Sequence, residues 1–222
     1  GMAGVRAIEE LLKYETDLYD ITVIGSEPHP NYNRIMLSPV LAGEKQIDDI
    51  ILNSYEWYTE NHIELITGDT VSKINRVKKS VETESGKSFA FDRLLIATGS
   101  MPFIIPVPGA DKQGVIGFRD IQDVDTMVEY SKKNKNAVVI GGGLLGLEAA
   151  NGLMKQGMNV TVVHLMDNLL ERQLDTTSSG MLKKSLEERG MKFMMQAQTA
   201  EILGEDAVTG IKFADGSSID TS

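Results

Sequence analysis

Three glycines, at positions 141, 143 and 146, are the residues of this chain best suited to chemistry. They follow the β-branched run VVI, and the last of them lies within LLGLE, which begins a helical pattern. In a strand–loop–helix unit, this G-x-G-x-x-G spacing allows a tight turn, close approach of the backbone to a pyrophosphate, and packing of the helix against the strand. The free N–H groups and the positive end of the helix dipole then hold the phosphates. A plain strand-to-helix turn, which needs glycine only to bend, is the alternative interpretation.

A second pair of glycines, Gly1 and Gly4, precedes the helical sequence VRAIEELLKY and is typical of the second half of another such loop. A leading Gly-Met can also be a cloning remnant. The apolar run ITVI is followed by Glu27, roughly 20 residues beyond the loop, where a dinucleotide fold places the acid that binds a ribose hydroxyl. We therefore expect a second nucleotide site whose first strand and first glycine lie upstream of residue 1.

Composition limits what these sites can do. The chain has 222 residues, a net charge of −10 and no cysteine. The charge argues against nucleic acid or an anionic membrane as partner. Without cysteine these residues hold no disulfide, iron–sulfur cluster or thiolate metal site, and no His/Asp/Glu cluster has the spacing of metal ligands. Redox chemistry here would have to come from an organic cofactor, and with neither a membrane span nor a signal peptide in the sequence we expect a cytoplasmic protein.

The hydrophobic pattern predicts an α/β fold with two dinucleotide-binding, Rossmann-like domains, each with a parallel sheet and a small antiparallel meander. The Pro-rich stretch 101–109 is the expected linker, which gives domains 1–106 and 107–222. In the first domain we expect helices over 4–14 and 54–61, buried strands at 21–24, 63–66 and 93–97, and a meander over 70–91. In the second we expect helices over 124–130, 144–155 and 176–189, strands at 137–140, 159–164 and 192–195, and an antiparallel extension over 199–219.

Four stretches of the sequence resemble a known family, the flavoprotein reductases with two dinucleotide folds, which includes glutathione reductase and the ferredoxin and rubredoxin reductases. These stretches are GMAGVRAIEELL, SEPHPNYNRIMLSPVLAGE, LLIATGSMPF and GGGLLGLEAANGL. Within that family they are most similar to the flavin part of the assimilatory NAD(P)H-nitrite reductase large subunits. The resemblance covers essentially the whole chain and implies two cofactors, FAD and NAD(P)H.

The resemblance also implies roles for individual residues. Arg34 and Ser38 would line the flavin side of the cleft, although Arg34 could instead be a solvated loop charge. Glu148 would face the nicotinamide pocket or, alternatively, favour the helix dipole. His164 stands where a NAD-specific site usually has an acid, and the nearest arginine is Arg172, so the choice between NADH and NADPH stays open. The remaining expected cofactor contacts are Gly1, Gly4, Glu27, Val71, Ala97, Thr98 and Gly99 toward FAD, and Gly141, Gly143, Leu144, Leu145 and Gly146 toward the nicotinamide nucleotide.

The implied function is that of an electron-entry module. A hydride would pass from NAD(P)H to FAD without help from a side-chain acid or base, and electrons would continue to iron–sulfur and sirohaem centres held elsewhere, for reduction of nitrite to ammonia. Such centres need cysteines, so the chain reads as a fragment truncated at both ends. An NADH-dependent ferredoxin or rubredoxin reductase and a non-catalytic NAD(P)-binding fragment are the alternatives, although Pro39 stands where many of those reductases have Lys. A homodimer is a family expectation.

Overall fold

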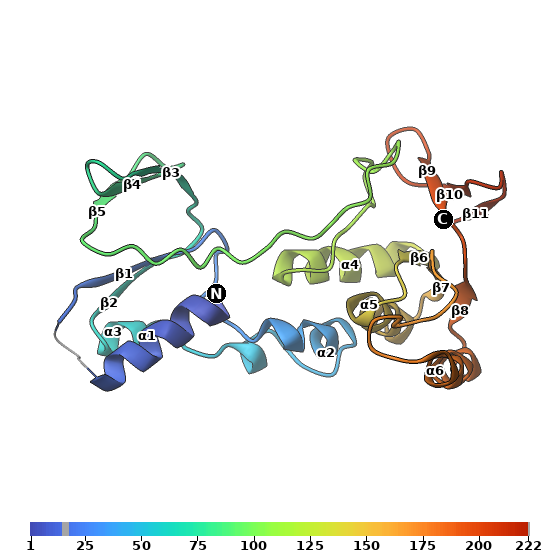
Figure 1. Ribbon diagram of the computed structural model, residues 1–222, viewed down its shortest axis with the longest axis horizontal. Helices are drawn as coiled ribbons and strands as arrows, with labels where there is room; N and C mark the ends of the chain where they lie inside the picture. Colours follow the sequence, from blue (N-terminus) through green and yellow to red (C-terminus); the bar gives the residue numbers. More distant parts are fainter. Residues whose placement is uncertain (15–17, 222) are drawn as a thin grey trace. The chain divides into compact units, whose positions relative to one another are not determined.

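The computed structural model describes residues 1–14 and 18–221, and their contacts divide them into two compact units (Figure 1). Unit 1 contains Gly1–Arg34 and Asp48–Ser100, and unit 2 contains Ile35–Ile47 and Met101–Ser222. The segment 35–47 therefore groups with the second half of the chain, although it lies early in the sequence. The expected domain boundary at residue 106 stays a prediction.

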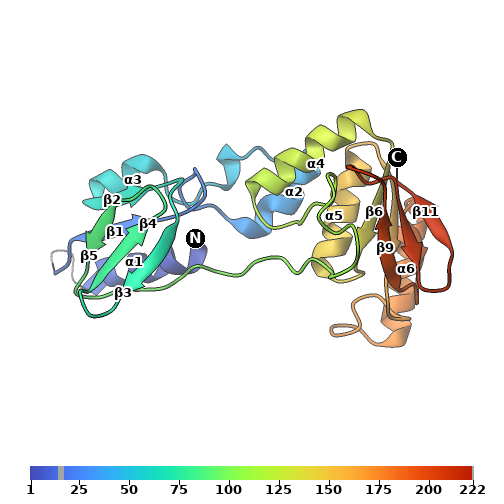
Figure 2. The ribbon, with the colours of Figure 1, turned by 90° about the horizontal axis from the view of Figure 1, so that it is seen from above.

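Unit 1 is built on a parallel pair of strands, β1 (Ile21–Ile24) and β2 (Ile63–Ile66), in register from Ile21 opposite Ile63. The helices α1 (Met2–Tyr14) and α3 (Tyr55–Glu60) bury Val5 and Tyr58 against Ile63. A three-stranded antiparallel meander completes the unit, as predicted, and can be followed in Figure 2. Its strands are β3 (Val71–Asn75), β4 (Ser80–Thr83) and β5 (Ser88–Ala90).

The strand expected at 93–97 was wrong. No strand is formed there in the described structure, and Leu95 and Ile96 are 64% and 63% exposed. An apolar run becomes a strand only when the backbone of a neighbouring strand pairs with it. No described strand of unit 1 pairs with residues 93–97. The prediction of a buried strand was therefore wrong in both respects, the burial and the strand pairing.

Unit 2 contains a parallel sheet in the order β6–β7–β8, with α5 packed on it (Figure 1). The predicted α/β alternation is therefore confirmed, and an antiparallel sheet β9–β11 follows it in the chain. The capping box of Asp120 and Asp123 starts α4 three residues before the predicted helix, because each side chain accepts a backbone N–H of the other residue. The bounds are α4 (Ile121–Lys133), β6 (Asn136–Ile140), α5 (Leu144–Lys155), β7 (Asn159–Val163), α6 (Thr176–Glu188), β8 (Lys192–Met194), β9 (Thr199–Leu203), β10 (Gly210–Phe213) and β11 (Ser218–Asp220).

The segment 35–47 adds a short helix, α2 (Leu37–Leu41), to unit 2. Its Leu41 is fully buried and packs on α5 at Gly152, where a Cβ added to the glycine would lie 2.6 Å from Leu41 Cγ. At the end of α5, the Gln156 side-chain amide donates to the Leu41 carbonyl oxygen at 2.7 Å. The glycine in α5 thus makes room for α2. In the chain, α2 lies between two 3₁₀ turns, η1 (Arg34–Met36) and η2 (Asp48–Ile50).

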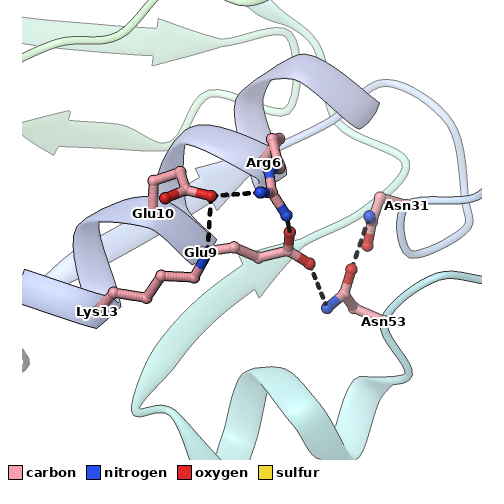
Figure 3. A network of polar contacts seen from close by, with 6 residues as sticks. All are labelled: Arg6, Glu9, Glu10, Lys13, Asn31 and Asn53. Carbon is pink, nitrogen blue, oxygen red and sulfur yellow. Dashed lines mark hydrogen bonds and ion pairs between the residues drawn. The ribbon is translucent and has the colours of Figure 1, made fainter.

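A polar network fixes the loop that leaves β1 in unit 1 (Figure 3). The buried Asn31 amide donates to Asn53 Oδ1 at 2.8 Å, and Asn53 in turn donates to Glu9 Oε1 of α1 at 3.2 Å. The Tyr58 hydroxyl, also buried, donates to Asn31 Oδ1 at 2.7 Å. Buried polar groups that are all paired specify one conformation of the chain, so this network holds the irregular loop 28–34 in place.

Within the residues described, no helix combines the length and apolarity that crossing a membrane requires.

Candidate functional site

The glycine loop of unit 2 has the geometry of an anion-binding turn. The Gly141 N–H donates to the Val163 oxygen of β7 at 2.8 Å, and Gly141 turns the chain with φ +120°, a conformation that favours glycine. Gly143 is the extended N-cap of α5, with φ −83°, and has no side chain to occupy the first N–H groups of the helix. A Cβ on Gly143 would meet no atom within 4 Å. The space over these N–H groups is therefore open to a ligand.

An open pocket of about 420 Å³ lies at this loop, a volume in the range of nucleotide and other small-molecule sites. It brings together the five residues predicted to hold the nicotinamide nucleotide. It adds four residues that the sequence did not single out for binding: Ile140, which ends β6, and Glu171, Arg172 and Gln173 from the loop after β7. The pocket is lined by Ile140, Gly141, Gly143, Leu144, Leu145, Gly146, Glu171, Arg172 and Gln173.

His164 follows β7 and is buried, with both ring nitrogens engaged by the protein. Its Nδ1 accepts the Gly142 N–H at 3.0 Å. The ring therefore carries its proton on Nε2, which lies 3.1 Å from the Asn168 oxygen and 3.3 Å from Glu171 Oε2. In this structure His164 ties the glycine loop to the loop after β7, and its direct contact with a ribose stays a prediction.

Ser38 and Glu148, both expected near the redox end of the cofactors, are brought together within unit 2. The Ser38 hydroxyl, on α2, donates to Glu148 Oε2, on α5, at 2.6 Å. A hydrogen bond to a carboxylate is stronger than one between neutral groups, so Ser38 restricts the orientation of Glu148. The two residues are 110 positions apart in the sequence, and only the docking of α2 on α5 makes them neighbours.

In unit 1, the carboxylate of Glu27 is held on both oxygens. Oε2 accepts the Tyr32 hydroxyl at 2.5 Å, and Oε1 pairs with the Arg34 guanidinium. That guanidinium also lies over the Tyr32 ring, 5.0 Å from its centre. Arg34 is therefore held beside Glu27, and Tyr32, which the sequence analysis did not single out, contacts both of these residues.

The other residues expected to bind FAD fall in two places of unit 1. Gly1 and Gly4 lie at the start of α1, where a Cβ on Gly4 would stand 3.1 Å from the Ala97 side chain. The segment 97–99 therefore has its first residue beside the N-terminus of α1. Its last residue, Gly99, adopts φ +74°. Val71 instead begins β3 of the meander and is exposed. Their contacts with a cofactor stay predictions.

Comparison with known proteins identifies the family of this chain. The pyridine nucleotide-disulphide oxidoreductase family matches residues 1–222. The chain belongs to this family. Members of this family use a flavin and NAD(P)H, so both kinds of cofactor are expected here.

Two relatives of this oxidoreductase come from Bacillus subtilis (strain 168). The chain is 56% identical over 220 residues to a nitrite reductase [NAD(P)H], with 99% of this chain and 27% of the relative covered. It is 47% identical to an assimilatory nitrate reductase electron transfer subunit, covering 99% of this chain and 28% of that protein. The chain thus spans about a quarter of the length of these relatives.

Among solved structures, a ferredoxin reductase from Rhodopseudomonas palustris superposes with a TM-score of 0.85 at 26% identity, covering 96% of this chain and 52% of the other. The α/β architecture predicted from the sequence is confirmed by this likeness.

Proposed function

We propose that this chain is the electron-entry module of a nitrite reductase. In this proposal unit 1 binds FAD, unit 2 binds NAD(P)H, and electrons leave toward iron–sulfur and sirohaem centres outside these residues. The 56% identity to a nitrite reductase supports this choice of acceptor within the family. Action in the cytoplasm and assembly as a homodimer are further expectations of the same proposal.

The observation that carries the nucleotide half of the proposal is the uncovered N-terminus of α5. Gly141, Gly143 and Gly146 line the pocket without side chains that could cover the first N–H groups of α5, and no acidic side chain lies in the first turn of that helix. A helix of this kind stabilises a phosphate by its N–H groups and its dipole together. The pyrophosphate of NAD(P)H fits this cradle.

The residues of unit 1 also fit FAD. Gly1 directly precedes α1, which begins at Met2, and a Cβ on Gly1 would meet nothing within 4 Å. Glu27 can accept a ribose hydroxyl because each carboxylate oxygen keeps a second lone pair beside Tyr32 or Arg34. When bound, a flavin supplies the conversion between two-electron hydride chemistry and one-electron transfer. The chain's own residues hold and orient the cofactors.

The proposal is tested on the chain together with FAD. We expect a yellow complex whose visible flavin absorbance is bleached by stoichiometric NAD(P)H under anaerobic conditions. A bleached complex that passes electrons to the iron–sulfur and sirohaem part of a nitrite reductase supports the full proposal. A flavin complex that no nicotinamide nucleotide reduces would contradict it.

A reductase for ferredoxin or rubredoxin is the second candidate, favoured by the superposition on a ferredoxin reductase. Such a protein would also bleach with NADH, so the bleaching experiment does not separate the two. Offering the reduced complex a ferredoxin, a rubredoxin and the sirohaem part in parallel does. Faster oxidation by the small iron–sulfur proteins would replace nitrite reduction as the function, whereas a chain that binds NAD(P)H but no flavin is a binding fragment.

A further inference from the structure

Glu171 contributes a carboxylate to the pocket at the glycine loop, and the sequence pattern did not predict it as a site residue. In a dinucleotide fold the ribose acceptor usually stands at the end of the second strand, which here is His164. His164 turns its ring toward Gly142 and the loop that follows, so it offers no acceptor to the pocket. Glu171 lies seven positions later, lines the pocket, and has a side chain that is 35% exposed.

The loop that carries Glu171 is held firmly against the glycine loop. Leu169 is fully buried, and its Cδ2 would stand 2.6 Å from a Cβ on Gly142. The Leu170 N–H donates to the Gly142 oxygen at 3.1 Å, and Leu170 adopts φ +52°, which is strained for a residue with a side chain. Gly142 therefore contacts His164, Leu169 and Leu170 at once. Glu171 follows directly and inherits a fixed position.

The charge of Glu171 distinguishes the two coenzymes. NADH presents two hydroxyls on its adenosine ribose, which a carboxylate accepts, whereas NADPH carries a phosphate on one of them, which a carboxylate repels. The neighbouring Arg172 also lines the pocket, but its charge suits the pyrophosphate that both coenzymes share. The His164 Nε2 lies 3.3 Å from Glu171 Oε2, and this contact restricts the orientation of the carboxylate.

We propose that Glu171, positioned by His164, is the residue that makes this site select NADH over NADPH. The inference rests on the proposed function of unit 2 as the nicotinamide-nucleotide site and names its substrate. It assigns to the loop after β7 the role that the strand end usually has, and it assigns to His164 a positioning role.

The test is a pair of binding titrations, NADH and NADPH, on the purified chain, followed by nucleotide fluorescence and repeated by calorimetry. We expect the wild-type chain to bind NADH at least about tenfold more tightly than NADPH. Glu171→Gln narrows that ratio to less than about threefold, chiefly by strengthening NADPH, and Glu171→Arg inverts it. Glu188→Gln, which neutralises an exposed glutamate at the end of α6, is the matched control and leaves the ratio unchanged.

Two further variants separate the roles. His164→Asn keeps an oxygen that can accept the Gly142 N–H but is too short to reach Glu171, so the ratio falls partway while the unfolding midpoint, measured in parallel, reports any loss of structure. Arg172→Gln weakens both coenzymes alike. The inference would be overturned if Arg172→Gln weakened NADPH binding alone, or if Glu171→Gln left the ratio of NADH to NADPH affinity unchanged. Neither result would contradict the nucleotide site itself. A wild-type chain that binds neither coenzyme would instead refute the proposed function of unit 2.

Discussion

Glycine has different tasks at adjacent positions of the loop after β6. At Gly142 a side chain would collide with Leu169 and His164, whereas at Gly143 it would enter open space. Gly143 also has an ordinary extended backbone, with φ −83°. The first glycine is therefore needed by the protein, and the second is needed only if a ligand comes close.

We predict that Gly143→Ala lowers the free energy of unfolding by no more than about 1 kcal/mol, because alanine is a poorer N-cap than glycine but would meet no other atom. The same change places a methyl group over the bare N–H groups of α5, so NADH affinity falls at least about tenfold. Urea unfolding and a fluorescence titration measure the two quantities. Gly142→Ala is the contrasting variant and lowers both; a Gly143→Ala chain that binds NADH normally would argue against a pyrophosphate there.

Asp69 is a buried carboxylate that anchors the turn of the unit 1 meander. Its Oδ2 accepts the Ser85 hydroxyl at 2.6 Å and its Oδ1 accepts the Ser85 N–H at 3.3 Å. The Ser85 hydroxyl, with smaller help from Thr83, holds the pKa of Asp69 below its ordinary value of 3.8. A lowered pKa in the folded state means that the charged form stabilises the fold, and that this stabilisation disappears only in acid.

We predict that the stability difference between wild type and Asp69→Asn is constant above about pH 5 and shrinks as the pH falls through the lowered pKa of Asp69. Protonation of the wild-type carboxylate is the reason, because it then resembles the neutral amide. Urea unfolding followed at several pH values measures the difference, and Asp111→Asn, at an exposed aspartate, is the control. A difference that grows in acid would contradict the assigned role.

At the scale of elements, the contact of α2 with α5 decides whether Ser38 can reach Glu148. The two helices meet where Leu41 fits against Gly152, so each residue constrains the other. This contact between α2 and α5, called the seam below, is sensitive to the side-chain volume at both positions because protein interiors are close-packed.

Gly152→Ala is expected to destabilise the protein by about 1–3 kcal/mol, since its Cβ would overlap Leu41. Leu41→Ala alone is expected to cost about 2–5 kcal/mol by leaving a cavity. The double variant is less destabilised than the sum of the two, because the new methyl group occupies space that Leu41 vacates. Chemical unfolding of the four proteins gives the coupling, and strict additivity would mean that the seam does not form.

A comparison of the predicted and observed helices shows which sequence signals were sufficient to predict an element. The helix 144–155 was predicted with its observed bounds because a strand, a glycine loop and a helical apolar pattern occur in succession. The helix α2 was not predicted, because five residues including Pro39 carry no periodicity and its stability comes from docking on α5. The site residues Glu171 and Arg172 were missed for a similar reason: a loop has no period, and only Leu169 and Leu170, by packing on Gly142, place it at the pocket.

At the scale of the whole molecule, charge governs behaviour in solution. With 32 acidic and 22 basic side chains the chain carries −10 at neutral pH, and its isoelectric point is about 4.8. Mutual repulsion keeps such molecules apart, and it vanishes at the isoelectric point.

We predict that light scattering of the purified chain is low at about pH 7 and rises to a maximum near pH 4.8, where the net charge vanishes. Static light scattering across a pH series measures this. A maximum near neutrality would show that an apolar surface, rather than net charge, controls association.

The segment 35–47 belongs to unit 2 although both of its chain neighbours belong to unit 1. During synthesis on the ribosome, α2 emerges roughly 100 residues before α5, at about 5–20 residues per second, and so waits several seconds for its partner. A gene fragment that starts after the proline-rich linker would lack α2 altogether and would expose Gly152 of α5, which Leu41 covers, to water. Dissection of this protein into expressible halves therefore has to graft the short helix onto the second half.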